Sequence, residues 1–270
     1  MNYLYFHMGN YPDHLIDSIK SVTVNDPDSK IFLCGDRCIN LPNVKFIESS
    51  KIISRQTKLA IDSSLWKYDP NPLWRSSIYR LFYLMDMMEH FDLNDFVHFD
   101  SDVLLFHSFD KIKESINLNK TGLHITPCND HELVFGYSYC NSYIKLCSIC
   151  DLVLQSMYDS SFLQSLIKDH PNEMQILSGI KKITDFIIDL PTIPILNNEY
   201  VFDPSSYGQY LFGTHSGEPV GWHGDHHWIG RMIKDKKLNI RILNGFPYVN
   251  NSKIVNLHIH SKKTKGIINV

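Results

Sequence analysis

The chain has 270 residues, of which 43% are hydrophobic and 12% aromatic, enough to fill the core of one large α/β domain. Its formal net charge of −3 provides no overall positive field for DNA or RNA, so any anionic partner is expected to be small. No apolar run reaches the roughly 18 residues that cross a bilayer, and the start MNYLYFHMGN lacks signal-peptide features. We therefore expect a soluble, cytoplasmic protein with no integral membrane segment and no nucleic-acid partner.

The six cysteines fit reduced thiols better than a disulfide framework. Cys147 and Cys150 have the spacing of a metal-binding pair, but they lie within the helical pattern NSYIKLCSICDLVLQSMY and the chain lacks a second such pair. A packed helix is therefore preferred over a zinc site at these two residues.

Strand-like and helical segments alternate along the first part of the chain. Short strands are predicted at 3–7, 30–36 and 44–48, with an amphipathic helix at 14–24. The clearest helix is predicted from Arg75 to His90, where apolar residues recur at helical spacing, and an apolar strand follows directly. This alternation predicts helices that cover a mostly parallel sheet.

The second part of the chain continues the pattern less regularly. Strands are predicted at 122–127 and 183–188, and helices from Asn141 and at 172–180. The region from Pro191 to Gly230 is rich in Gly, Pro, Asn and aromatic residues, which indicates long functional loops. The segments RILN and IVNLHIH are predicted strands, and the basic SKKTKG follows them. We see no internal repeat and no linker.

Two carboxylates interrupt the apolar segment FVHFDSDVLLF, at Asp100 and Asp102. They follow a short strand, and ligands of open α/β sheets gather at the carboxyl ends of strands. In an extended segment the two side chains would lie on the same side, and burying them ionised requires compensation. Hard oxygen ligands suit Mg²⁺ or Mn²⁺, which commonly also bind substrate phosphates. The alternative is that Asp100 and Asp102 cap a turn and pair with a nearby Arg or Lys.

The run SSIYRLFYLMDMMEHFDLNDFVHFDSDVLLF resembles nucleotide-sugar glycosyltransferases of the A-type fold, in the glycogenin-like and lipopolysaccharide galactosyltransferase group. The resemblance implies a single Rossmann-like domain over 1–270, with a central mixed, mostly parallel sheet flanked by helices. Residues 1–106 would form the nucleotide-binding half and 107–270 the acceptor-side half. Asp100 and Asp102 of the DxD motif would bind Mn²⁺ or Mg²⁺, with Ser101 near the donor ribose. Arg80 would lie near the donor, or pair structurally with the aspartates.

The segment NLHIHSKK resembles the late motif of this family, in which a histidine completes the metal site and basic residues face the diphosphate. His258 and His260 would share one face of a strand. In the family a small residue follows the ligand by three positions, and Ser261 has this spacing from His258, so His258 is the preferred ligand over His260. The family's Gly and Lys-Pro-Trp are absent, and Lys262 replaces them only approximately.

Two further groups are placed by the resemblance. Tyr5, His7 and Met8 end the first strand, where the family holds the nucleotide base; a core role is their alternative. Glu173 and Gln175 resemble the acidic-Gln segment near the donor sugar and are catalytic candidates; a surface helix is the alternative.

The segment GWHGDHHWIG carries several potential metal ligands. They are His223, Asp225, His226 and His227. Because neighbouring side chains diverge on a strand or helix, zinc is the less favoured interpretation. An acceptor-side loop is preferred, since aromatic and small polar residues suit sugar binding; burial of these aromatics against the core is its alternative. If the reaction inverts the sugar, Asp225, Glu173 and Glu218 are candidate bases.

These residues predict a metal-dependent glycosyltransferase that moves a sugar from a nucleotide-diphosphate donor, most simply a UDP-sugar, to a glycan or other hydroxyl acceptor. A metal-dependent phosphohydrolase is one alternative, although it would need further acidic motifs at successive strand ends. A non-catalytic sugar-binding module is the other.

Overall fold

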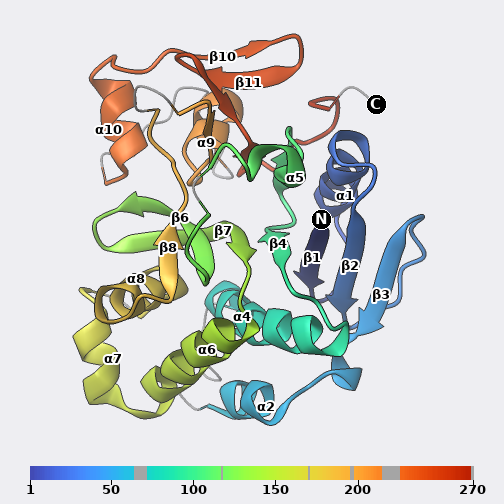
Figure 1. Cartoon of the computed structure of the whole chain (residues 1–270), viewed down its shortest axis with the longest axis vertical. Helices are drawn as coiled ribbons and strands as arrows, with labels where there is room; N and C mark the ends of the chain where they lie inside the picture. The colour runs from blue at the N-terminus through green and yellow to red at the C-terminus, as the bar shows by residue number, and fades with distance from the viewer. Residues whose placement is uncertain (64–71, 117, 170, 195–197, 215–225, 269–270) are drawn as a thin grey trace.

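The structure is a computed structural model, and it describes residues 1–63, 72–116, 118–169, 171–194, 198–214 and 226–268. A seven-stranded sheet in the order β3-β2-β1-β4-β7-β6-β8 lies at its centre (Figure 1). The strands are β1 Asn2–His7, β2 Lys30–Gly35, β3 Val44–Glu48, β4 Phe96–Phe99, β6 Leu123–Asn129, β7 Glu132–Cys140 and β8 Ile187–Asp189. β7 pairs antiparallel with β4 and β6, and all other neighbours pair parallel. The predicted mixed, mostly parallel sheet is confirmed.

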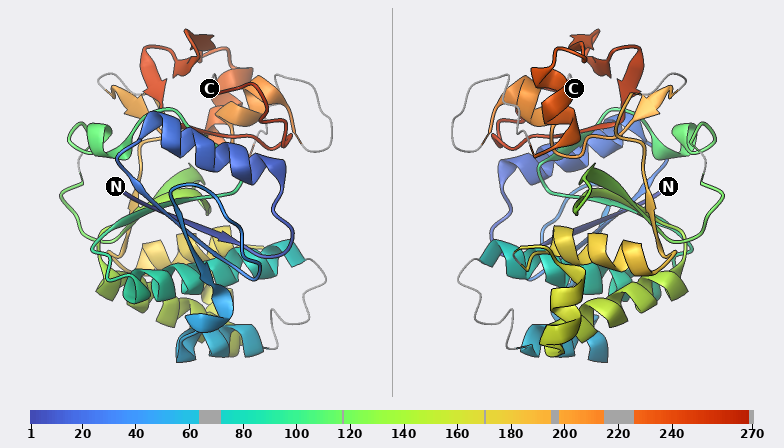
Figure 2. Two further views of the ribbon diagram at one scale, coloured as in Figure 1. Left: turned by 90° about the vertical axis from the view of Figure 1, so that its right-hand side faces the viewer. Right: turned by 90° about the vertical axis from the view of Figure 1, so that its left-hand side faces the viewer.

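Helices cover both faces of this sheet (Figure 2). They are α1 Asp13–Asn25, α2 Arg55–Asp62, α4 Pro72–His90, α5 Phe109–Ile112, α6 Tyr143–Tyr158, α7 Ser160–Leu166 and α8 Glu173–Ile183, with the 3₁₀ turn η1 Ser49–Lys51. α1 lies on one face, whereas α4, α6 and α8 lie on the other. The helices predicted from Arg75, from Asn141 and at 172–180 are confirmed.

Alternating residues of β1 show how the core forms on both faces of the sheet. Leu4 packs in the apolar cluster with the α4 and α6 residues, whereas Tyr3 and Tyr5 belong to the cluster that includes α1. Both tyrosine rings meet Phe99 of β4 edge-on, with centroids 5.9 and 5.2 Å apart. A strand buried on both faces reads as a nearly continuous apolar run, which is what the sequence of β1 shows.

The C-terminal part of the chain adds several smaller elements. They are β9 Tyr200–Val201, α9 Tyr207–Phe212, α10 Trp228–Lys234, β10 Ile240–Leu243, β11 Phe246–Val249, β12 Ser252–Ile254 and β13 Asn256–His258. Four of the strands form a sheet in the order β10-β11-β12-β9. The described parts of 191–230 therefore contain β9, α9 and the start of α10, where the sequence predicted only loops.

A two-stranded ladder positions the site. β5 Val103–Leu105 follows the DxD turn and pairs antiparallel with β13, so that Val103 lies opposite His258. The apolar side chains of β5 are buried in two different clusters, Val103 and Leu105 in one and Leu104 in the other. This burial holds the C-terminal segment against the DxD turn. Among the described residues, no helix is long and apolar enough to cross a membrane.

Candidate functional site

The DxD aspartates lie in a turn between β4 and β5, not in the extended segment that the sequence predicted. The amide of Val103 donates to the Asp100 carbonyl over 3.0 Å, which closes the turn around Ser101. The Asp100 amide donates to the Gly136 carbonyl of β7, also over 3.0 Å. The Asp102 side chain is 3% exposed and that of Asp100 25%, so one carboxylate is buried and the other is reachable.

Each aspartate has its own cationic partner. Arg80 of α4 forms an ion pair with Asp100, and Lys262 forms one with Asp102. Burial would raise the pKa of Asp102, but the His258 ring and the Lys262 ammonium hold that pKa well below its ordinary value. The structural pairing with Arg or Lys that the sequence left open is thus present at both carboxylates.

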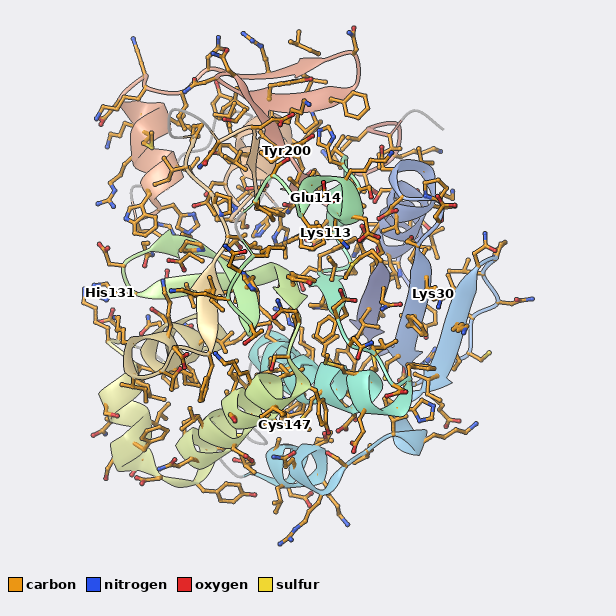
Figure 3. All side chains as sticks on the ribbon, in the orientation of Figure 1. Lys30, Lys113, Glu114, His131, Cys147 and Tyr200 are labelled. Atoms are coloured by element: carbon orange, nitrogen blue, oxygen red, sulfur yellow. The ribbon has the colours of Figure 1, made fainter. Side chains whose placement is uncertain are left out.

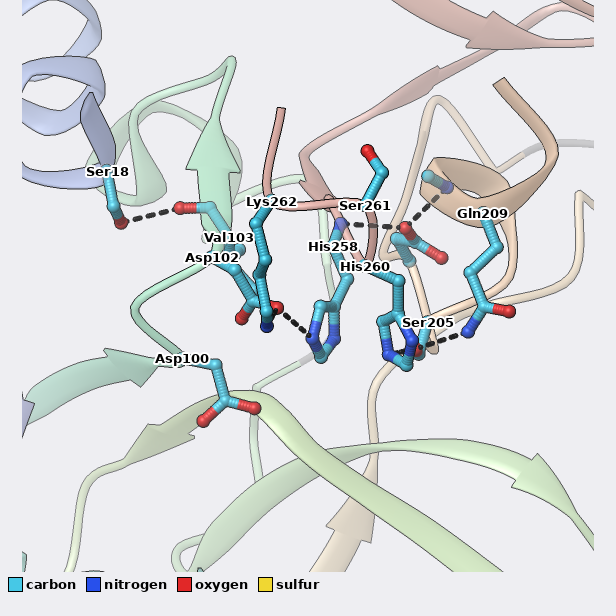
Figure 4. A network of polar contacts seen from close by, with 12 residues as sticks. Ser18, Asp100, Asp102, Val103, Ser205, Gln209, His258, His260, Ser261 and Lys262 are labelled. Atoms are coloured by element: carbon cyan, nitrogen blue, oxygen red, sulfur yellow. Dashed lines mark hydrogen bonds and ion pairs between the residues drawn. The ribbon is translucent and has the colours of Figure 1, made fainter. Parts of the chain in front are cut away.

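His258 faces the same carboxylate from the end of β13 (Figure 4). Its Nε2 lies 3.2 Å from Asp102 Oδ2. Its Nδ1 is buried and has no hydrogen-bond partner within the described chain. A Cβ atom on Gly136 would come within 2.9 Å of this nitrogen, so the ring packs against bare backbone of β7. Ligand atoms of Asp100, Asp102 and His258 all lie within 4.8 Å of one another.

Asp203 fixes the backbone of His258, and sequence analysis missed it. Its two buried oxygens accept hydrogen bonds from the amides of Ser206, Tyr207, Gly208 and His258, over 2.6 to 2.9 Å. Burial raises the pKa of Asp203, and these four amides oppose the shift. An Asp three residues before the N-cap Ser206 was the available signal, since Asp side chains often accept hydrogen bonds from nearby backbone amides.

His260 lies beside His258 but has other partners. The two ring centroids are 4.6 Å apart. The Nε2 atom of His260 lies 2.9 Å from the Ser205 hydroxyl oxygen, which accepts a hydrogen bond from Gln209. β13 ends at His258, so the shared strand face predicted for the two histidines is not formed. The structure thus brings His258, and not His260, to Asp102.

Arg80 also joins Asp100 to Glu173, the first residue of α8. Its Nη2 lies 2.8 Å from Glu173 Oε1, and its guanidinium carbon lies 5.0 Å from the centre of the Phe135 ring. Burial raises the pKa of Glu173, and Arg80 opposes this shift. Gln175 lies elsewhere: its Oε1 accepts hydrogen bonds from the backbone between α7 and α8, which gives this side chain a structural role.

The end of β1 only partly matches its predicted role at the nucleotide base. Tyr5 is 1% exposed, and its hydroxyl lies 3.1 Å from that of Ser18, so this residue has the core position that the sequence left open as its alternative. His7 is half-buried, with Nε2 2.9 Å from the Asn10 carbonyl oxygen, and Met8 is 43% exposed. His7 and Met8 therefore remain accessible to a ligand.

His14, in the first turn of α1, is a further residue that sequence analysis missed. Burial and the Lys262 charge lower the pKa of His14, while the Asp102 charge raises it. Its position just after β1, at the edge where ligands gather, was the available signal. Asp225, Glu218 and the remainder of 215–225 lie outside the described residues.

No known family model and no curated protein matches the chain. Similar solved structures include the galactosyltransferase LgtC in complex with donor and acceptor sugar analogs, at 14% identity, with 87% of this chain and 94% of that chain covered and a TM-score of 0.45. Mouse xyloside xylosyltransferase 1 in its apo form is 9% identical, with 74% and 88% covered and a TM-score of 0.48. The apo-form glycosyltransferase GlyE of Streptococcus pneumoniae TIGR4 is 12% identical, with 96% and 54% covered and a TM-score of 0.46.

All three of these proteins are named as glycosyltransferases. Because the identities and TM-scores are low, we base the function on the residues of the site.

Proposed function

We propose that the protein transfers a sugar from a nucleotide-diphosphate donor, a UDP-sugar, to a hydroxyl group of a glycan or another acceptor, using Mn²⁺ or Mg²⁺. The observation that carries this proposal is the convergence of Asp100, Asp102 and His258, whose ligand atoms lie within 4.8 Å of one another. Two carboxylates and an imidazole fit such a cation, and substrate phosphates commonly fill its remaining positions. Among the described residues the His258 Nδ1 atom has no hydrogen-bond partner, so the ring is held by packing, with Nε2 toward the carboxylate.

Asp100, Asp102 and His258 would hold the cation, which when bound offsets negative charge on the departing diphosphate. Lys262 has a half-exposed side chain, so its ammonium is able to leave Asp102 and meet the diphosphate. Arg80 would keep Asp100 oriented from the opposite side, because it is itself fixed by Glu173. These contacts preorganise positive charge where the leaving group develops negative charge.

Glu173 supports Arg80 in this scheme and is not a free base, because its carboxylate is buried against the guanidinium. Asp225 remains our candidate base for an inverting reaction. His7 and Met8 are proposed to contact the base of the nucleotide, and Ser101, at the tip of the DxD turn, the ribose.

Calorimetry with UDP, with and without Mn²⁺, tests the proposal. We expect UDP to bind the wild-type protein only with the metal, and Asp102→Asn to abolish this binding while the fold is kept. Asp28→Asn is the matched control, because Asp28 is exposed and lies away from the DxD turn. A screen of UDP-sugars should then show slow metal-dependent hydrolysis of one donor.

Two results would contradict a transferase. Glycan binding that ignores both UDP and Mn²⁺ would identify a sugar-binding module. Release of inorganic phosphate from simple phosphate esters, without sugar release from any donor, would identify a phosphohydrolase.

A further inference from the structure

A second group of metal-ligand side chains lies away from the DxD turn. Cys128 belongs to β6, Glu132 begins β7, and His227 directly precedes α10. One ligand atom from each of the three lies within 4.8 Å of the other two. From the sequence, zinc was the less favoured interpretation of the run around His227, whereas the fold gives this histidine two partners that are distant in sequence. We propose that Cys128, Glu132 and His227 form a Zn²⁺ site.

Hydrogen bonds already orient all three residues. The Cys128 thiol donates to the Glu132 carbonyl, with 3.5 Å between sulfur and oxygen. Asn129 Nδ2 donates to Glu132 Oε2 over 2.8 Å, and the Ser206 hydroxyl oxygen lies 3.0 Å from His227 Nδ1. Metal-binding histidines are commonly held in this way through one ring nitrogen while the other binds the ion, and coordinating carboxylates are hydrogen-bonded as well. The group is therefore arranged before an ion arrives.

Burial and charge also favour a cation at this place. Cys128 is 1% exposed and His227 6%, and Glu132 is half-buried. Within the described chain, no Lys or Arg forms an ion pair with Glu132. A partly buried carboxylate beside a thiol is costly without a compensating charge, and a divalent ion would supply that charge.

The donor types select zinc. Sulfur, nitrogen and oxygen ligands together suit Zn²⁺, whereas Mg²⁺ and Mn²⁺ prefer the oxygen-rich set at the DxD turn. Three protein ligands leave a fourth tetrahedral position for water. On binding, the Cys128 thiol loses its proton to solvent and becomes a thiolate ligand. The ion would then join the turn between β6 and β7 to the start of α10.

Cobalt substitution tests the site without any assay of transfer. Co²⁺ is added in the presence of excess Mg²⁺, which occupies the oxygen-rich site, and the near-ultraviolet thiolate-to-cobalt band is recorded. We expect the band in the wild-type protein and its loss in Cys128→Ser. Cys147→Ser is the matched control, because Cys147 lies on α6, in a different layer from the β6–β7 turn that His131 marks (Figure 3). This variant should keep the band.

Two further variants guard against an unfolded Cys128→Ser protein. Glu132→Gln keeps the thiol and the side-chain shape and should weaken Co²⁺ and Zn²⁺ binding. Ser206→Ala should weaken it about 10- to 100-fold, the usual loss when a ligand's orienting partner is removed. The proposal is overturned if the wild-type protein shows no thiolate band, or if all three variants bind Co²⁺ as the wild type does.

Discussion

Replacing Lys262 by Met tests the charge balance of the DxD turn most directly. The Lys262 ammonium forms an ion pair with the buried carboxylate of Asp102. A cation that binds this carboxylate must first displace the ammonium. Lys262→Met removes the charge and keeps much of the side-chain length. We therefore expect Mn²⁺ to bind this variant more tightly than the wild type when no nucleotide is present.

The magnitude follows from the exposure of the pair. A hydrogen bond to a charged group contributes about 1.5–3 kcal/mol. Because the Lys262 side chain is 49% exposed, water screens part of this interaction, and we expect about 1–2 kcal/mol. That difference corresponds to roughly 5- to 30-fold tighter Mn²⁺ binding. With Mn²⁺ saturating, UDP should bind the variant more weakly, because the diphosphate loses its lysine.

Titration of Mn²⁺, followed by the electron paramagnetic resonance signal of the free ion, measures the effect. Lys263→Met is the control, because Lys263 is the exposed neighbour and has no ion pair within the described chain. Equal or weaker Mn²⁺ binding by Lys262→Met would refute the idea that the ammonium competes for the metal position.

Three other changes have defined outcomes. Arg80→Lys should lose most donor hydrolysis and about 1–3 kcal/mol of unfolding free energy, because Lys cannot bridge Glu173 and the DxD turn. A variant with the wild-type hydrolysis rate and the wild-type urea midpoint would show that Arg80 does not belong to the site. His258→Ala should weaken Mn²⁺ binding in the presence of UDP by about 1–3 kcal/mol, whereas His260→Ala should do less, and the reverse order would make His260 the ligand. Burial, together with the charge of Lys253, lowers the pKa of His107 to about 4 in the folded protein. As the pH falls from about 6.5 toward 4, this histidine binds a proton in the unfolded chain but not in the folded one, so the free energy of unfolding decreases. His107→Phe should remove about 1 kcal/mol of the stability lost between about pH 7.5 and 5.5 in urea unfolding, and an equal loss in both proteins would contradict this.

Local patterns predicted the framework well. The apolar spacing between Arg75 and His90 defined a helix, and the short apolar runs around it defined parallel strands, because these signals depend on neighbours along the chain. The placing of Asp100 and Asp102 after β4 was also readable, since a pair of carboxylates in an apolar run is conspicuous.

Long-range partners were not readable in the same way. β7 was not predicted, because ELVFGYSYC mixes small, polar and aromatic residues, and the role of Gly136 depends on a histidine that is distant in sequence. Asp203 acts through amides that only the folded chain assembles. The partners of Gln175 were not readable for the same reason, since the spacing along α8 says nothing of the backbone amides that its side chain contacts.

The β5–β13 ladder has a consequence for how the protein is made. Asp102 and His258 are 156 positions apart in the chain. A contact between residues so far apart in sequence requires the loss of loop-closure entropy before it forms. During synthesis at about 5–20 residues per second, His258 emerges about 8–30 s after Asp102. The nascent chain therefore holds Asp100 and Asp102 for that time without His258. On the proposed function, the three-residue metal site would be complete only after the C-terminal segment has folded, so a bound ion would stabilise a finished fold.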